Sequence, residues 1–179
     1  MAGIEYRMPV AARALVVVLV LWGLLAGPAA RAGRWVETPY QPQKVLFEFY
    51  FNEPAQIDAA LYWLRSFLNP LMAAPYHLAP EENDIIVLLH GTEIVTVAKK
   101  NYARYRRAVD RMAYYAELGV RFRVCGLAAE DYDYAVEDFQ DFVEVVPSAI
   151  TEIAHWQQQG YALIVPRILD KRYRIDEIR

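Results

Sequence analysis

Apolar residues gather in five short runs along the chain. The first, Lys44–Phe51, reads KVLFEFYF and is aromatic or β-branched and nearly all apolar. Such runs are typical of strands, and near-continuous apolarity is typical of a strand covered on both faces, as in a parallel sheet. Four shorter runs are also expected to be strands: Asp84–Leu89, Val120–Cys125, Phe142–Val146 and Tyr161–Val165.

Helical patterns separate these five strands. The clearest is Asn101–Leu118, where apolar residues recur every three or four positions before Gly119. Another helix is expected to open at Asn52-Glu53-Pro54 and to end at Asn69-Pro70, with a long loop after it. Two more helices are expected, over Glu130–Gln140 and from Pro147-Ser148 to Gly160.

The alternation of strands and helices predicts an α/β fold. We expect a single three-layer domain over residues 44–179, with about five strands in a mainly parallel sheet and helices on both faces. Residues 33–43 contain Pro39 and Pro42 and are expected to form an extended lead-in. The sequence has neither an internal repeat nor a second domain.

Residues 1–32 have the three-part layout of a secretory signal peptide. The first 13 residues carry Arg7 and Arg13, which makes this segment basic. Ala14–Ala26 carries no charge, and Ala30-Arg31-Ala32 has the small-residue pattern of a cleavage site. We expect cleavage after Ala32 and a periplasmic or otherwise exported domain without a membrane span. The alternative is an uncleaved N-terminal anchor, although the apolar run is shorter than the roughly 20 residues of a bilayer span.

Composition and net charge exclude some classes of protein. The chain is 56% hydrophobic, which excludes a disordered protein. Removal of residues 1–32 takes away three arginines and one glutamate and changes the net charge from −3 to −5. A domain with this negative charge lacks the basic surface that binds nucleic acid. Its single cysteine cannot form an intramolecular disulfide, although export favours disulfides.

Polar and reactive residues follow the predicted strands. In an open parallel sheet the carboxyl ends of the strands meet at one edge, where ligands bind. We therefore expect four segments to meet there: Asn52-Glu53, His90-Gly91-Thr92-Glu93, Cys125-Gly126 and Pro147-Ser148.

Cys125 is the most informative residue of this edge. A thiolate at a strand end, ahead of a helix, is nucleophilic and can carry sulfane sulfur as a persulfide, and Gly126 lets the backbone approach it closely. The alternative is a small, buried apolar side chain. His90 is a candidate base toward Cys125 or a turn residue, and Gly91, Thr92 and Glu93 are candidate substrate-binding residues. The spacing of histidines, carboxylates and the cysteine predicts no metal site.

Several segments together resemble the DsrE/DsrF-like sulfur-relay family, over about Lys44–Ile168. The most specific are His90-Gly91 at a strand end, the Gly-Val-x-Phe-x-Val-Cys-Gly run that ends at Gly126, and the Gln159-Gly160-Tyr161 turn. The resemblance implies a small α/β domain that assembles into trimers or hexamers. It also implies a persulfide on Cys125, partner proteins that donate or accept sulfur, and no organic cofactor.

Two departures accompany the resemblance. Well-known sulfur-relay members are cytoplasmic, whereas this chain carries an export signal. The segment after Cys125 is acidic, where active relatives often have a basic residue and glycine.

Three functions follow as hypotheses. The first is a periplasmic sulfur carrier with sulfurtransferase-like activity, in which Cys125 accepts and donates sulfane sulfur and His90 lines the site. The second is a non-catalytic oligomeric module that binds a ligand or a protein and has a structural cysteine. The third is redox sensing through an intermolecular disulfide. The 13 tyrosines and 4 tryptophans favour a homo-oligomer, because aromatic residues are enriched at interfaces.

Overall fold

The computed structural model describes residues 32–179 of the chain. The predicted signal peptide lies outside the described residues except for Ala32, so its cleavage stays a prediction. Within the described part, no helix has the length and apolar character needed to cross a membrane. The folded unit is Pro39–Arg179.

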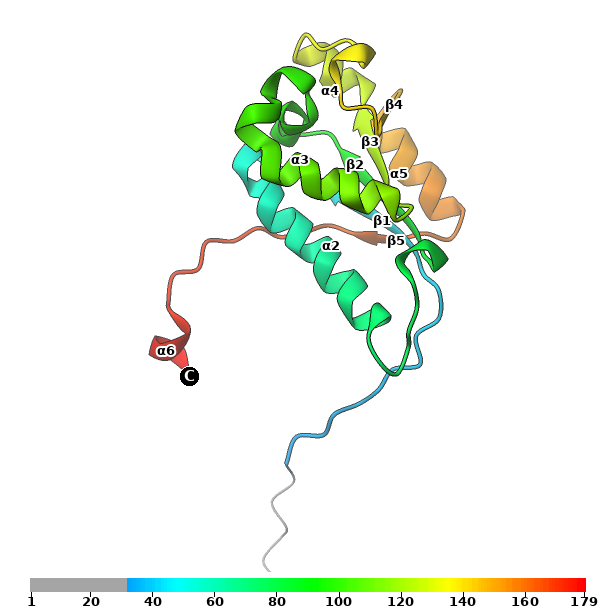
Figure 1. Ribbon diagram of the computed structural model, residues 1–179, viewed down its shortest axis with the longest axis vertical. Coiled ribbons are helices and arrows are strands. Elements are labelled where there is room, and N and C mark those ends of the chain that lie inside the picture. The colour runs from blue at the N-terminus through cyan, green and yellow to red at the C-terminus, as the bar shows by residue number, and fades with distance from the viewer. Residues whose placement is uncertain (1–31) are drawn as a thin grey trace, which may run out of the picture. The chain divides into compact units, whose positions relative to one another are not determined.

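Five strands form one sheet in the order β4-β3-β2-β1-β5, and every neighbouring pair is parallel (Figure 1). This confirms the predicted α/β fold with a parallel sheet. Each strand has about the predicted position, with ends trimmed by one or two residues in all but β2. The strands are β1 (Lys44–Phe49), β2 (Asp84–Leu89), β3 (Arg121–Cys125), β4 (Val143–Val146) and β5 (Ala162–Ile164).

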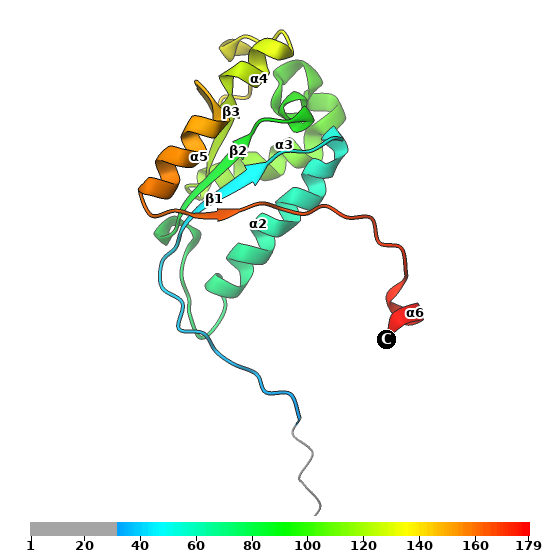
Figure 2. The same cartoon turned by 180° about the vertical axis from the view of Figure 1, so that it is seen from behind.

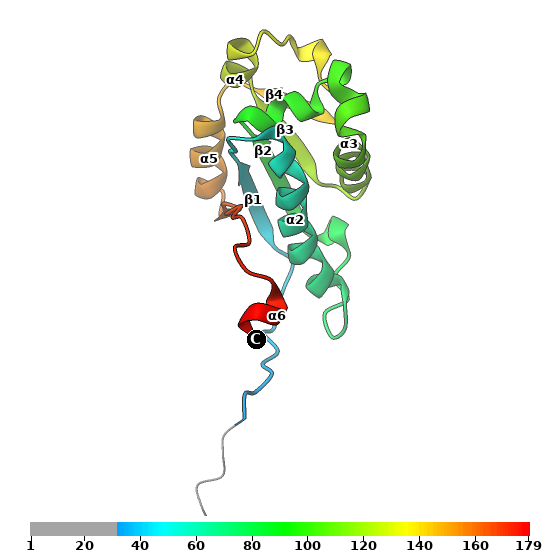
Figure 3. The ribbon, with the colours of Figure 1, turned by 90° about the vertical axis from the view of Figure 1, so that its left-hand side faces the viewer.

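Helices cover both faces of the sheet. Helices α2 (Ile57–Met72) and α3 (Tyr102–Glu117) pack on one face, and α5 (Ala149–Gln158) packs on the other, as Figure 3 shows with the sheet between them. The short α4 (Gly126–Asp131) lies at the edge where β3 ends, and the reverse view in Figure 2 shows it beside that end of the sheet. A last turn of helix, α6, spans Ile175–Ile178.

The two faces of the sheet differ in chemistry. Side chains alternate between faces along each strand. The face toward α2 and α3 is apolar and includes Phe47, which packs edge-on against Phe67 of α2. The face toward α5 mixes buried Leu46 and Leu88 with charged side chains, since Arg123 pairs with a carboxylate of α5. The α5 face is therefore the polar side of the core.

The first helix ends later than predicted. Pro70 lies inside α2, which continues to Met72 rather than ending at Asn69-Pro70. Proline lacks an N–H and breaks a helix most strongly in its interior, but here it sits in the last turn. The extra turn buries Leu71 against the core, and this burial offsets the hydrogen bond that Pro70 cannot make.

The helix predicted over Glu130–Gln140 was wrong. Helix α4 begins immediately after β3, at Gly126, and ends at Asp131. Two alanines of this segment are buried, which gives α4 its packing, and Asp133 has a positive φ of 56°, which turns the chain out of the helix. The acidic stretch that follows contains only a 3₁₀ turn at Val136–Asp138.

Candidate functional site at the carboxyl edge of the sheet

Glu93 joins the ends of β1 and β2. Its side chain is completely buried. One carboxylate oxygen accepts the backbone N–H groups of His90 and Gly91, both at 2.8 Å, and the other accepts that of Phe51 at 3.0 Å. Burial raises the pKa of Glu93, and the backbone N–H groups oppose that rise. The sequence presented Glu93 as a substrate-binding candidate, and in the structure its carboxylate binds the protein's own backbone.

Gly91 and Thr92 belong to the same junction. A Cβ at Gly91 would lie 2.7 Å from the Glu93 carboxylate and 2.8 Å from the backbone nitrogen of Phe51, so only glycine fits there. Thr92 donates its hydroxyl hydrogen to the backbone carbonyl of Phe51 at 2.8 Å. These contacts fix the loop that carries His90.

His90 is held on several sides. Its ring nitrogen Nε2 lies 3.0 Å from Oε1 of Glu48, and its ring stacks on Tyr50 with centroids 4.8 Å apart. Its backbone N–H is bound by Glu93. The imidazole is therefore a fixed, mostly buried group rather than a mobile side chain on a loop.

Cys125 ends β3 and directly precedes α4. The residue is 6% exposed, and its Sγ accepts the backbone N–H of Ala149, the first residue of α5, at 3.3 Å. The N-terminus of a helix carries partial positive charge and favours an anion such as a thiolate. The structure thus places the thiol against two helix starts, and the donor comes from α5.

Close packing against β4 also favours glycine at position 126. A Cβ there would lie 3.0 Å from the carbonyl oxygen of Val146 and 3.5 Å from that of Pro147. The glycine therefore lets α4 start close against the end of β4. The sequence had suggested that this glycine lets the backbone approach a group on the sulfur.

The two arginines of β3 share the face of Cys125 but are engaged elsewhere. Arg123 pairs with Glu144 at 2.8 Å and with Glu152 at 2.6 Å. Arg121 pairs with Asp84 and also donates to the hydroxyl of Tyr161. Their charges are thus matched by carboxylates on the α5 face of the sheet, of which Glu152 is mostly buried.

His90 and Cys125 lie at the same edge of the sheet but make different contacts. The register of β2 with β3 ends where Leu89 pairs with Val124, so His90 follows the last paired residue of β2. Its ring contacts Glu48 and Tyr50, whereas Sγ of Cys125 contacts the start of α5. The edge therefore carries the predicted base with an acid beside it, and the predicted nucleophile next to α5.

A small pocket opens at this edge. Its volume is about 230 Å³, and it lies between the ends of β1 and β2 and helix α4. The lining includes His90 and, from the first turn of α4, Ala128. Its other polar lining residues are Tyr50, Asn52, Thr92, Asp131 and Tyr132.

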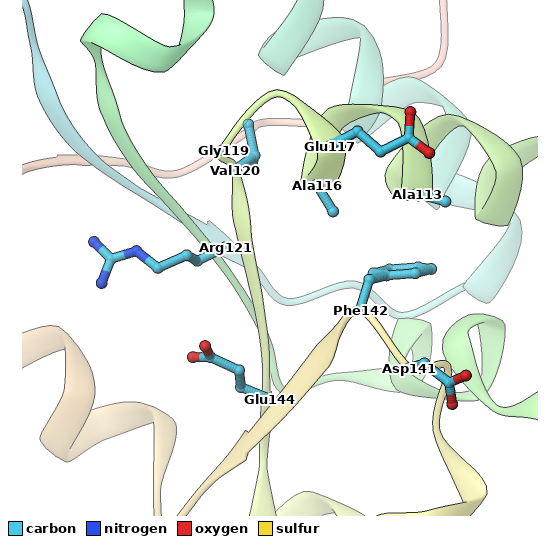
Figure 4. A pocket seen from close by; sticks show the side chains of 9 residues that line it. All are labelled: Ala113, Ala116, Glu117, Gly119, Val120, Arg121, Asp141, Phe142 and Glu144. Carbon is cyan, nitrogen blue, oxygen red and sulfur yellow. The ribbon is translucent and has the colours of Figure 1, made fainter.

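A larger cavity lies elsewhere. It measures about 560 Å³ and is lined by the end of α3 and the first residues of β3 and β4, including Ala116, Arg121 and Phe142 (Figure 4). This is the amino end of those strands, whereas open parallel sheets bind ligands at the carboxyl ends. Its lining also contains neither the cysteine nor a histidine. The carboxyl edge is therefore the candidate site.

Comparison with known proteins gives the chain a family. The model of the DsrE/DsrF-like family matches residues 49–166. The chain belongs to the DsrE/DsrF-like family. This confirms the resemblance drawn from the sequence, and it covers every candidate site residue from His90 to Gly126.

A solved structure shares the fold of this DsrE/DsrF-like protein. It is the protein of unknown function MTH1491 from Methanobacterium thermoautotrophicum, which is 18% identical, with a TM-score of 0.56 over 69% of this chain and 99% of that chain. At this identity the likeness concerns the fold alone. No curated protein matches the chain.

Glu48 was not among the candidate residues predicted from the sequence. It contacts His90, which is 42 residues away, and that contact depends on how β1 and β2 pair in the sheet. The described residues also contain no group of three or more histidine, cysteine or acidic side chains that could hold a metal ion.

Proposed function

We propose that this DsrE/DsrF-like protein is an exported sulfur carrier that holds sulfane sulfur as a persulfide on Cys125 and passes it to a partner protein. One observation carries the proposal: the Sγ of Cys125 accepts the N–H of Ala149 at the start of α5. A charge-assisted hydrogen bond of this kind stabilises the thiolate, which is the form that attacks sulfur.

The transfer step needs no external oxidant. The Cys125 thiolate attacks the outer sulfur of a donor persulfide, R–S–SH. A new S–S bond forms to Sγ as the donor S–S bond breaks, and the donor leaves as a thiolate that takes up a proton. Delivery is the same exchange in reverse, with an acceptor thiolate attacking the outer sulfur and Cys125 leaving.

The burial of Cys125 limits which molecules reach its sulfur. Only 6% of the residue is exposed, which limits the access of other oxidants and thiols to the sulfur. In a persulfide the outer sulfur lies about 2 Å beyond Sγ, so a partner has to reach only that atom. The donor and the acceptor are accordingly proposed to be proteins that dock at the carboxyl edge.

The test is mass spectrometry after exposure to a sulfane donor. The purified chain should gain the mass of one sulfur atom, and a thiol reductant should remove it. Cys125→Ser should gain nothing. Absence of the mass gain in the wild-type chain would contradict the carrier and support the other candidate, a non-catalytic oligomeric binding module, which the burial of Cys125 favours.

A sharper variant removes the hydrogen-bond donor alone. Ala149→Pro deletes the N–H that binds Sγ, and Ser148 already has the extended backbone (φ −156°, ψ 135°) that precedes proline. We expect sulfur loading to slow about tenfold, because hydrogen bonds to charged groups contribute about 1.5–3 kcal/mol. Ala149→Val adds similar bulk but keeps the N–H, and should load at nearly the wild-type rate.

A further inference from the structure

Aromatic residues line much of the pocket between the ends of β1 and β2 and helix α4. They are Tyr50, Phe51, His90 and Tyr132. The rings of Tyr50 and His90 are stacked, with centroids 4.8 Å apart and an angle of 19° between their planes. Tyr50 is 66% exposed and Tyr132 is 41% exposed, so solvent reaches both side chains. The faces of such rings carry negative electrostatic potential and attract cations.

Asp131 gives the same pocket a carboxylate. The residue ends α4 and is exposed, and within residues 32–179 neither a hydrogen bond nor an ion pair engages its side chain. The lining contains neither lysine nor arginine. Residues 126–142 contain no basic residue and six acidic ones, of which one, Asp141, forms a salt bridge within the described part of the chain. The local charge is therefore negative, which favours a cation in the pocket.

His90 brings no unbalanced positive charge to this pocket. Its Nε2 lies 3.0 Å from Oε1 of Glu48, whose side chain is 19% exposed. When the imidazole is protonated, the adjacent carboxylate balances its charge. When the imidazole is neutral, the carboxylate of Glu48 remains as a further negative charge beside the pocket. The pair therefore does not repel a cation in either state of the ring.

We propose that this pocket binds a small organic ammonium ion, with its cationic group against the rings of Tyr50 and Tyr132 and its charge matched by Asp131. Aromatic rings are the groups with which proteins recognise alkylated ammonium ions, and a carboxylate adds charge attraction. A metal ion suits the pocket less, because it takes several oxygen, nitrogen or sulfur ligands and the lining offers one carboxylate. The volume of about 230 Å³ is below the roughly 300–1,000 Å³ of sites for drug-sized ligands, so the occupant is small.

The probe is choline, and the control ligand is neohexyl alcohol, which has the choline skeleton with a neutral carbon in place of the charged nitrogen. Each is titrated into the purified, isotope-labelled protein, and the backbone amide signals of Gly91, Thr92 and Tyr132 are followed by NMR. We expect choline to shift these signals with a dissociation constant on the order of 1 mM, and the alcohol to bind at least about tenfold more weakly. Equal affinities for the two ligands, or no shift with choline up to about 50 mM, would overturn the proposal.

Two variants test the assigned groups. Asp131→Asn keeps the size of the side chain and removes its charge, and should weaken choline binding about fivefold while leaving the alcohol unaffected. Tyr132→Leu removes a ring and should weaken choline binding about threefold to tenfold. Both residues are exposed, so these changes should leave the fold intact, which the thermal midpoint checks. If Tyr132→Leu lowers that midpoint, Asp131→Asn decides alone, and wild-type affinity in a folded variant would place the probe elsewhere.

Matched controls separate this site from other effects. Asp133→Asn removes the same charge two residues further on, outside the pocket lining, and asparagine tolerates the positive φ of 56° there. It should bind choline as the wild type does, and a weakening equal to that of Asp131→Asn would sink the proposal. Cys125→Ser should also keep wild-type affinity, because Cys125 does not line the pocket and the inference goes beyond sulfur transfer. Choline binding without sulfur loading would uphold this site and contradict the carrier.

Discussion

Glu93 is the one charged side chain that is completely buried among residues 32–179. We expect Glu93→Gln to lower the free energy of unfolding by about 1–3 kcal/mol, because the amide NH₂ would face a backbone N–H and leave it unsatisfied. Urea unfolding at neutral pH measures this loss. The matched change Glu81→Gln, at an exposed position, should stay within about 0.5 kcal/mol of the wild type.

The same carboxyl predicts a pH dependence. Burial raises the pKa of Glu93 above its ordinary value of 4.5, so the folded chain binds this proton more tightly than the unfolded chain. The stability that protonated Glu93 contributes to the folded chain is therefore complete at pH values below 4.5. It is lost as the pH rises through the pKa of Glu93 in the folded chain. Unfolding measured from about pH 4 to about pH 8 should show the gap between wild type and Glu93→Gln narrowing toward neutral pH. A widening gap would contradict this sign.

Gly91 gives a steric prediction at the same junction. Gly91→Ala places a methyl group 2.7 Å from the Glu93 carboxylate and 2.8 Å from the backbone of Phe51. We expect a loss of about 1–3 kcal/mol in unfolding free energy from overpacking, seen as a lower thermal midpoint. Gly33→Ala, where no atom lies within 4 Å, should have no such effect.

Helix α5 depends on polar contacts more than on apolar burial. Ala149 is its one buried residue, whereas Arg123 of β3 pairs with Glu152 and lies 5.1 Å from the ring of Trp156. We expect Trp156→Ala to raise hydrogen exchange in α5 about tenfold or more while α2 keeps its protection, because local stability follows local packing. Ile150→Ala, at an exposed position of the same helix, should leave exchange unchanged.

The strands could be predicted because each one is a short apolar run in the sequence. Asp84–Leu89 reads as a buried apolar run, and β2 has those bounds. The positions of His90 just after β2 and of Cys125 at the end of β3 also followed from the sequence, since parallel strands end at one edge. The pairing of Glu48 with His90 did not follow, because it depends on a register between strands about 40 residues apart. Helix α4 was missed because two buried alanines are too short a pattern to show periodicity.

At the scale of the whole molecule, exposed aromatic residues support the proposal of a homo-oligomer. Tyr115 is buried, but Tyr114 is 57% exposed and Tyr62 61% exposed. Aromatic side chains on a surface are typical of interfaces. We expect light scattering coupled to gel filtration to give three or six times the mass of one chain at micromolar concentration. A monomer mass over that range would contradict the assembly.

We propose that the protein is exported, which would place its single thiol outside the cytosol. Residues 32–42 are exposed, and the folded unit begins at Pro39, so cleavage after Ala32 would leave every strand and helix of that unit in place. We expect N-terminal sequencing of the protein from an exporting host to begin at Gly33. Changing Ala30 and Ala32 to leucine should block processing and retain the protein in the membrane fraction, because the cleavage site requires small residues. Recovery of the unprocessed wild-type chain from the cytosol would contradict export. In that case Cys125 would lie in the cytosol, where small reduced thiols are abundant. Those thiols would compete with the partner protein for the sulfur that Cys125 carries.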